Sequence, residues 1–126
     1  MEREALENLI AAVEAGDGWP DRPHSAFSDE LADAAADWGG YAYMGSLDAA
    51  KALHEALLPG WDFAVEKGAH DVYGVKIAAG KYRAFVRSLD SRSEASVFFP
   101  TGIADNPARA WLLAVLKAKL AEQEDP

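Results

Sequence analysis

The loop from residue 17 to residue 24 contains the side chains that are best suited to chemistry. Two carboxylates, an arginine, a histidine and a tryptophan stand within these eight residues, among them Trp19, Asp21 and His24. Such a loop could line a small-molecule or peptide site, because loops on a rigid scaffold present polar side chains to ligands. The alternative interpretation is a rigid linker in which Trp19 fills part of the core.

Four aromatic residues bracket the start of the helix that is expected after Ser46. They are Trp38, Tyr41, Tyr43 and Trp61. Aromatic side chains with polar tips are common in binding pockets and interfaces, and they also fill junctions between layers of a fold. Tyr41 and Tyr43 are therefore candidate ligand or partner contacts, with core packing as the alternative, and Tyr41 is expected to be the most exposed of the four.

The remaining sequence offers little chemistry. It contains none of the short motifs of metalloproteases, serine hydrolases or nucleotide-binding proteins. It has no cysteine, which excludes disulfides, thiolate zinc sites and cysteine nucleophiles. His54 stands on an apolar helix face, and we expect a hydrogen-bonded, partly buried residue rather than a ligand. No catalytic residue, cofactor or metal ion is expected, and a non-enzymatic role is favoured.

Two helices are expected in the first third of the chain. Apolar residues at helical spacing predict a helix over 2–15, which Gly16 ends. A second, alanine-rich helix is expected over 29–38, and the pair Gly39-Gly40 is expected to end it.

Two further helices are marked by caps and stops. Ser46 is an N-cap for the third helix, and Pro59-Gly60 terminates it. Asn106 caps the last helix, and Pro107 stands at its first position, where the missing N–H costs nothing.

Four strands are expected between the third and the last helix. Alternating apolar and polar residues predict strands over 61–66, 73–77, 82–86 and 95–99, joined by short turns. The expected element order is α-α-α-β-β-β-β-α in one domain spanning residues 1–126. This is an α+β fold, a three-layer α/β/α sandwich with a four-stranded, mainly antiparallel sheet.

Phe85 and Phe98 point to the face of this sheet that is expected to lie away from the core. Helices on both faces, or contact with a second copy of the chain, would cover them. They are therefore candidate oligomer contacts, and replacing both with Ser is expected to weaken self-association.

Three segments resemble one known family. They are the helix start 46–50 with Tyr43 before it, the turn 59–61 and the helix start 106–108. Together they resemble the phage ABA-sandwich domain family of small phage and prophage proteins, whereas residues 44–45 depart from its pattern. The resemblance implies a three-layer α/β/α domain of uncharacterised function, and it transfers no catalytic residue.

The formal net charge is −9, concentrated in residues 1–66, whereas residues 67–92 are net basic. This acidity disfavours nucleic acid as a partner, although the basic cluster of Lys76, Lys81, Arg83, Arg87 and Arg92 could meet an acidic partner. The alternative for this cluster is a solvated strand face.

The function expected from the sequence is that of a phage or prophage accessory module that binds a protein partner and forms a homo-oligomer. The alternative is a small-molecule-binding protein or cryptic enzyme that uses the loop 17–24. The start of the chain does not resemble a signal peptide, and the sequence contains no long apolar segment. No membrane association and a cytoplasmic location are therefore expected.

Overall fold

The structure is a computed structural model that describes residues 2–20, 27, 29–67, 81–88 and 100–124. The described elements form an α+β fold with a three-stranded antiparallel sheet. In chain order they are α1 (Glu2–Ala15), α2 (Asp29–Tyr43), α3 (Leu47–Leu57), β1 (Asp62–Lys67), β2 (Tyr82–Arg87), β3 (Thr101–Ala104) and α4 (Pro107–Glu124).

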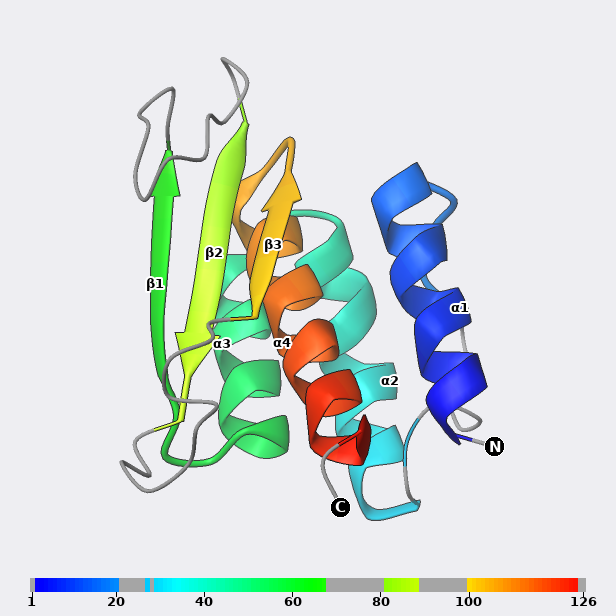
Figure 1. The fold of residues 1–126 in the computed structure, drawn as a ribbon. Coiled ribbons are helices and arrows are strands. Elements are labelled where there is room, and N and C mark those ends of the chain that lie inside the picture. The colour runs from blue at the N-terminus through cyan, green and yellow to red at the C-terminus, as the bar shows by residue number, and fades with distance from the viewer. Residues whose placement is uncertain (1, 21–26, 28, 68–80, 89–99, 125–126) are drawn as a thin grey trace.

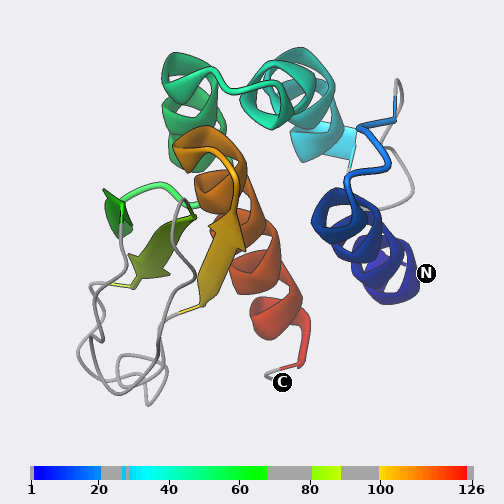
Figure 2. The ribbon, with the colours of Figure 1, turned by 90° about the horizontal axis from the view of Figure 1, so that it is seen from above.

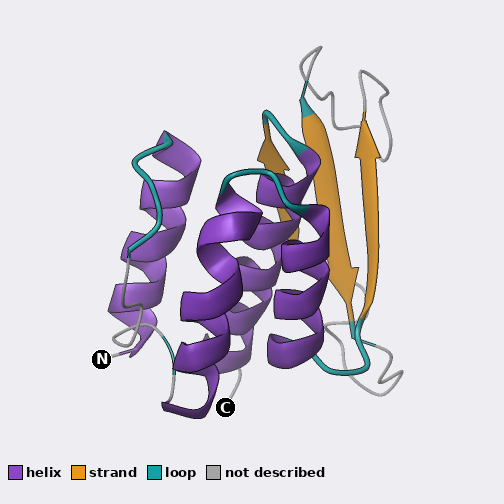
Figure 3. Ribbon diagram, turned by 180° about the vertical axis from the view of Figure 1, so that it is seen from behind, coloured by secondary structure: helices purple, strands orange, loops and turns teal. Residues whose placement is uncertain are grey.

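The four helices lie on one side of the sheet (Figures 1 and 2). The strand order is β1-β2-β3, and both neighbouring pairs are antiparallel. Helix α4 packs directly on β2 and β3, α3 lies beside it towards β1, and α1 and α2 pack on α4 further from the sheet (Figure 3). The core therefore lies between the sheet and the helices, with α4 at its centre.

Helix α4 is buried on almost every side. All residues from Ala110 to Leu116 are buried, which is typical of a helix that other elements surround. Gly102 in β3 allows the closest approach, because a Cβ there would collide with the carbonyl of Ala110 and lie 2.7 Å from the nitrogen of Ala114. The absence of a side chain at this position is what lets α4 pack against the strand.

The expected end of the first helix and the expected caps of the third and last helices are confirmed. Gly16 follows α1 with a positive φ of 79°. The Ser46 hydroxyl accepts a hydrogen bond from the Ala49 nitrogen at 3.1 Å, which caps α3. The Asn106 side-chain oxygen accepts one from the Arg109 nitrogen at 2.8 Å, which caps α4.

The expected end of the second helix is wrong. Helix α2 continues through Gly39-Gly40 to Tyr43. The reason is a long-range contact, since a Cβ at Gly39 would collide with the ring of Trp19. Gly39 therefore makes room for a neighbouring side chain, and the positive φ of 115° lies further on, at Gly45.

Two of the four expected strands are confirmed as β1 and β2, within one residue at their ends. Strand β3 at 101–104 was not expected, and the glycine in its interior weakens the sequence signal for a strand. The strands expected over 73–77 and 95–99 lie outside the described residues. The α/β/α sandwich is not confirmed, because all four helices lie on one face of the described sheet.

Candidate functional site

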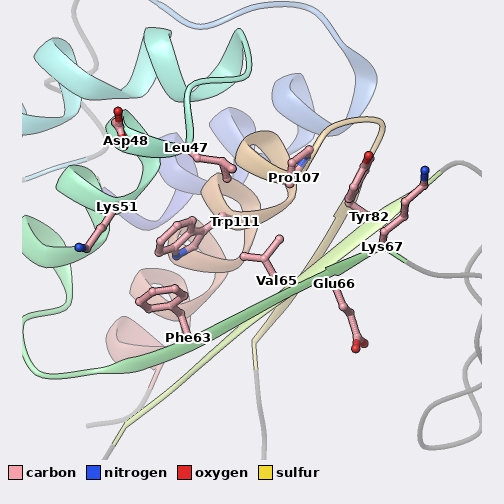
Figure 4. A pocket seen from close by; sticks show the side chains of 10 residues that line it. All are labelled: Leu47, Asp48, Lys51, Phe63, Val65, Glu66, Lys67, Tyr82, Pro107 and Trp111. Atoms are coloured by element: carbon pink, nitrogen blue, oxygen red, sulfur yellow. The ribbon is translucent and has the colours of Figure 1, made fainter.

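An apolar groove lies between β1, the start of α3 and the start of α4 (Figure 4). Its volume is about 540 Å³. Its apolar lining consists of Leu47, Phe63, Val65, Tyr82, Pro107 and Trp111. Charged residues at its rim are Asp48, Lys51, Glu66 and Lys67. A concave, mainly apolar lining with a few polar groups is a common composition of binding sites.

Two large apolar side chains of the groove remain exposed. Phe63 is 46% exposed and Leu47 is 47% exposed. The Phe63 ring stacks on the Trp111 ring with centroids 4.2 Å apart and an interplanar angle of 27°. The fixed ring stack gives the groove a preformed apolar wall that a partner could cover.

His54 connects this wall to neighbouring elements through hydrogen bonds of its two ring nitrogens. Its Nε2 lies 2.9 Å from the Trp61 carbonyl oxygen, and its Nδ1 lies 3.2 Å from the Trp111 indole nitrogen. An indole N–H only donates and a carbonyl only accepts, so these partners assign the proton to Nε2. The expected hydrogen bonding of His54 is confirmed, but the residue is fully rather than partly buried, and both of its ring nitrogens have partners.

The charged residues of the rim differ in how far they are engaged. Glu66 points away from the groove in Figure 4 and accepts a hydrogen bond from Arg83 Nε at 2.8 Å. Lys51 lies 3.8 Å from the carboxylate of Glu55 in an exposed pair. The ammonium of Lys67 lies 6.0 Å from the centre of the Tyr82 ring. The rim therefore offers two cationic groups, Lys51 and Lys67, and the acidic Asp48 close to an apolar wall.

The residues that the sequence singled out lie elsewhere. Trp19 is half-buried against Gly39, and its indole nitrogen is buried without a partner among the described residues. Tyr41 is 67% exposed on α2. Asp21 and His24 lie outside the described residues. The structure therefore does not assemble these side chains into one described site.

Tyr43 is buried and used internally. Its hydroxyl accepts a hydrogen bond from the Gly18 nitrogen at 3.0 Å. The guanidinium of Arg109 lies 3.9 Å from the ring centre, and its Nε donates to the Tyr43 carbonyl at 3.1 Å. These contacts join the end of α2 to the loop after α1 and to α4.

The two phenylalanines proposed as oligomer contacts have different outcomes. Phe85 lies in β2 on the face opposite to the buried Ala84 and Val86, and it is half-buried. The Arg83 guanidinium lies 5.8 Å from its ring centre. Phe98 lies outside the described residues. Neither position tests the predicted self-association.

The described members of the basic cluster each pair with a carboxylate. The pairs are Lys81 with Asp105, Arg83 with Glu66, and Arg87 with Asp62. Arg83 is buried, so the interpretation of a fully solvated face is wrong for this residue. Lys76 and Arg92 lie outside the described residues. Paired cations are less available to a phosphate backbone than free ones.

The groove was not anticipated from the sequence. The alternation around Phe63 and Val65 correctly predicts a strand. The one buried face that such alternation implies is not observed, because Phe63 is exposed and Val65 is only partly buried. Phe63 lies on β1, which is an edge strand among the described strands, and local sequence patterns do not encode strand order. Only a signal for strand order could have revealed the groove.

The described residues contain neither a metal-binding cluster nor a membrane-spanning helix. No group of three or more His, Asp or Glu side chains there could hold a metal ion. No helix in the described parts of the chain is long and apolar enough to cross a membrane. Comparison of the chain with protein-family models, with curated proteins and with solved structures finds no match.

Proposed function

We propose that this chain is a protein-binding module, of the kind that phages and prophages encode as small accessory proteins, and that its partner docks in the groove. The observation that carries the proposal is the half-exposure of Leu47 and of Phe63, whose ring stacks on the buried Trp111. Buried apolar and aromatic anchors supply most of the binding energy in protein interfaces, and a preformed pocket reduces the ordering cost.

The phage assignment rests on the sequence resemblance, and the groove supports the binding role independently of it. The matching segments of that resemblance include the starts of α3 and α4, which form one end of the groove. A module of this kind would act by occupying or bridging a partner. The charged rim would select the partner, and the apolar wall would retain it.

The test compares two exposed apolar residues, one at the start of α3 and one in the turn before it. Leu47 lines the groove, whereas Met44 is 78% exposed and does not line it. Immobilised wild type, Leu47→Gln and Met44→Gln are each incubated with bacterial lysate, and retained proteins are quantified by mass spectrometry. The affinity of any retained protein is then measured after purification.

The proposal predicts a stoichiometric partner that wild type and Met44→Gln retain and that Leu47→Gln binds about tenfold more weakly. A partner that binds both variants equally well would place the interface elsewhere. Retention of no protein above an empty support would contradict the binding role.

A small-molecule site near Trp19 is the second candidate. It is favoured by the indole nitrogen of Trp19, which is buried and has no partner among the described residues. A ligand thermal-shift screen tests it. A hit whose shift disappears in Trp19→Phe, which lacks the N–H, would support this site, and a hit that keeps its full shift would not.

A further inference from the structure

We propose that the groove receives an extended peptide segment, which adds as a strand to the edge of β1 that no described strand occupies and carries two apolar residues and one acidic residue at alternate positions. This inference rests on the proposed function, since it assigns the chemistry of the partner at the same groove. It is carried by the strand order, by the direction of the β1 backbone groups and by the charge at the rim.

Strand β1 is an edge strand among the described strands. It pairs with β2 on one side, and β3 lies on the far side of β2 (Figure 1). No described strand lies on its other side, and residues of β1 line the groove together with residues of α3. An exposed edge presents unpaired N–H and C=O groups, which are a template for another strand.

The register identifies which β1 groups face outward. The Val86 nitrogen donates to the Pro100 carbonyl at 3.2 Å, so the backbone groups of Val86 point to β3. The neighbouring Phe85 must then point to β1, where it lies opposite Ala64. Because these directions alternate along a strand, Phe63, Val65 and Lys67 direct their N–H and C=O groups outward.

An independent contact supports these directions of the β1 backbone groups. Trp61 precedes Phe63 by two residues and shares its direction. Its carbonyl is taken by His54 of α3 and so points away from β2.

The same residues set the spacing of the partner's side chains. Phe63 and Val65 line the groove with their side chains. Residues directly opposite each other on paired strands share a face, so alternate side chains of an added strand would lie over the groove. These side chains are about 7 Å apart along a strand. The segment therefore places two apolar residues, at positions i and i+2, opposite Phe63 and Val65.

The charge at the rim defines the next position. Lys67 follows Val65 on the same face of β1, and among the described residues it pairs with no carboxylate. The nearest acid in the strand, Glu66, is engaged by Arg83 on the other face. The residue of the partner opposite Lys67 is therefore acidic, two positions from the apolar pair.

A second copy of this chain suits the edge less well. If β1 pairs with β1 of a second copy, residues whose backbone groups point outward must lie opposite one another. If Val65 faces Val65 of the second copy, Lys67 faces Phe63, and if Val65 faces Phe63, Lys67 faces Trp61. Neither register gives Lys67 a carboxylate, so we commit to a segment of another protein.

The experiment uses a random nonapeptide library, selected on the full immobilised chain and counter-selected on Leu47→Gln. Alternating spacing of two apolar residues and one acid is the expected result. An acid preceding the apolar pair indicates an antiparallel strand, and an acid following it indicates a parallel one. Enrichment at helical spacing, or no enrichment, would overturn the inference.

The best selected peptide is then N-methylated at each amide in turn. Pairing with β1 predicts that binding weakens about tenfold or more at every second amide and little at the others.

The second measurement exchanges the charges of Lys67 and of the acidic peptide residue. Lys67→Glu should weaken the acidic peptide about five- to tenfold, and a peptide with Lys at the acidic position should regain that loss.

The outcomes separate this inference from the proposed function. The lysate experiment can yield a partner that depends on Leu47 while the selected peptides show helical spacing, or while N-methylation weakens binding with no alternation along the peptide. This result overturns only the proposal of an added strand. Failure of both the lysate and the library experiment overturns both. A dimeric mass of the free chain that Val65→Lys converts to a monomer would make the occupant a second copy and overturn the chosen partner.

Discussion

At the scale of single residues, two adjacent glycines in α2 have different roles. A Cβ at Gly39 would collide with the Trp19 ring, whereas a Cβ at Gly40 would lie 3.7 Å from the nearest Trp19 atom, an ordinary contact. The sequence signal is the same for both, and it was interpreted as a helix end. Only the position of Trp19, twenty residues earlier, distinguishes them.

Gly39→Ala is therefore expected to lower the stability of the fold and Gly40→Ala to raise it. The gain from replacing a helical glycine with alanine is about 1 kcal/mol. At Gly39 this gain is outweighed by overpacking, which costs about 1–3 kcal/mol. Urea unfolding of both variants checks the prediction. Equal stabilisation by both would mean that Trp19 does not pack on Gly39.

A second prediction at this scale concerns Asp105. The hydrogen bond and charge of Lys81 hold the pKa of this carboxyl below its ordinary value of 3.8, against a small opposing effect of desolvation. A lowered pKa in the folded state stabilises the protein above the ordinary value, and this contribution is lost as the pH falls through the folded pKa.

Asp105→Asn should therefore lower the melting temperature slightly at neutral pH, and the difference from wild type should vanish in acid. High salt should also reduce the difference, because the pair is exposed. Asp33→Asn, on the exposed surface of α2, is the matched control. A difference that persists unchanged at low pH would show that the pair is not its source.

At the scale of elements, the junction of α3, β1 and α4 depends on one polar residue. His54 of α3 accepts a hydrogen bond from Trp111 of α4 and donates one to the carbonyl before β1. It also lies edge-on to Phe63, with ring centroids 5.2 Å apart. The groove wall therefore keeps its shape through a buried hydrogen-bonded network.

His54→Leu should destabilise the fold by about 1–3 kcal/mol for each partner left unsatisfied. His54→Gln should lose less, because its amide retains one donor and one acceptor. Chemical unfolding followed by tryptophan fluorescence measures both. Equal losses in the two variants would mean that packing, rather than hydrogen bonding, is the contribution of His54.

Elements with local signals were predictable from the sequence, and those that depend on packing were not. Ser46 and Asn106 cap helices through contacts three residues away, so the starts of α3 and α4 were correct. Strand β3 was missed because Gly102 is required by the close approach of α4, a contact that no local pattern encodes.

At the scale of the whole molecule, the described helices lie on one face of a three-stranded sheet, and β1, an edge strand among the described strands, lies next to a groove. The alternation in β1 predicted an apolar face, yet the groove arises from strand order and from the spacing between α3 and β1. The candidate residues Trp19, Tyr41 and Tyr43 were chosen by composition, which carries no information about the edge of a sheet. The groove could be recognised only after the fold was known.

Backbone amide exchange along β1 tests the central claim most directly. In the free chain, the amides of Phe63, Val65 and Lys67 should exchange quickly, while those of Ala64 and Glu66, directed to β2, should be protected. Addition of a selected peptide should protect the first three as well. Protection of Phe63 and Val65 in the free chain, or no change on peptide binding, would contradict the proposal that β1 receives an added strand.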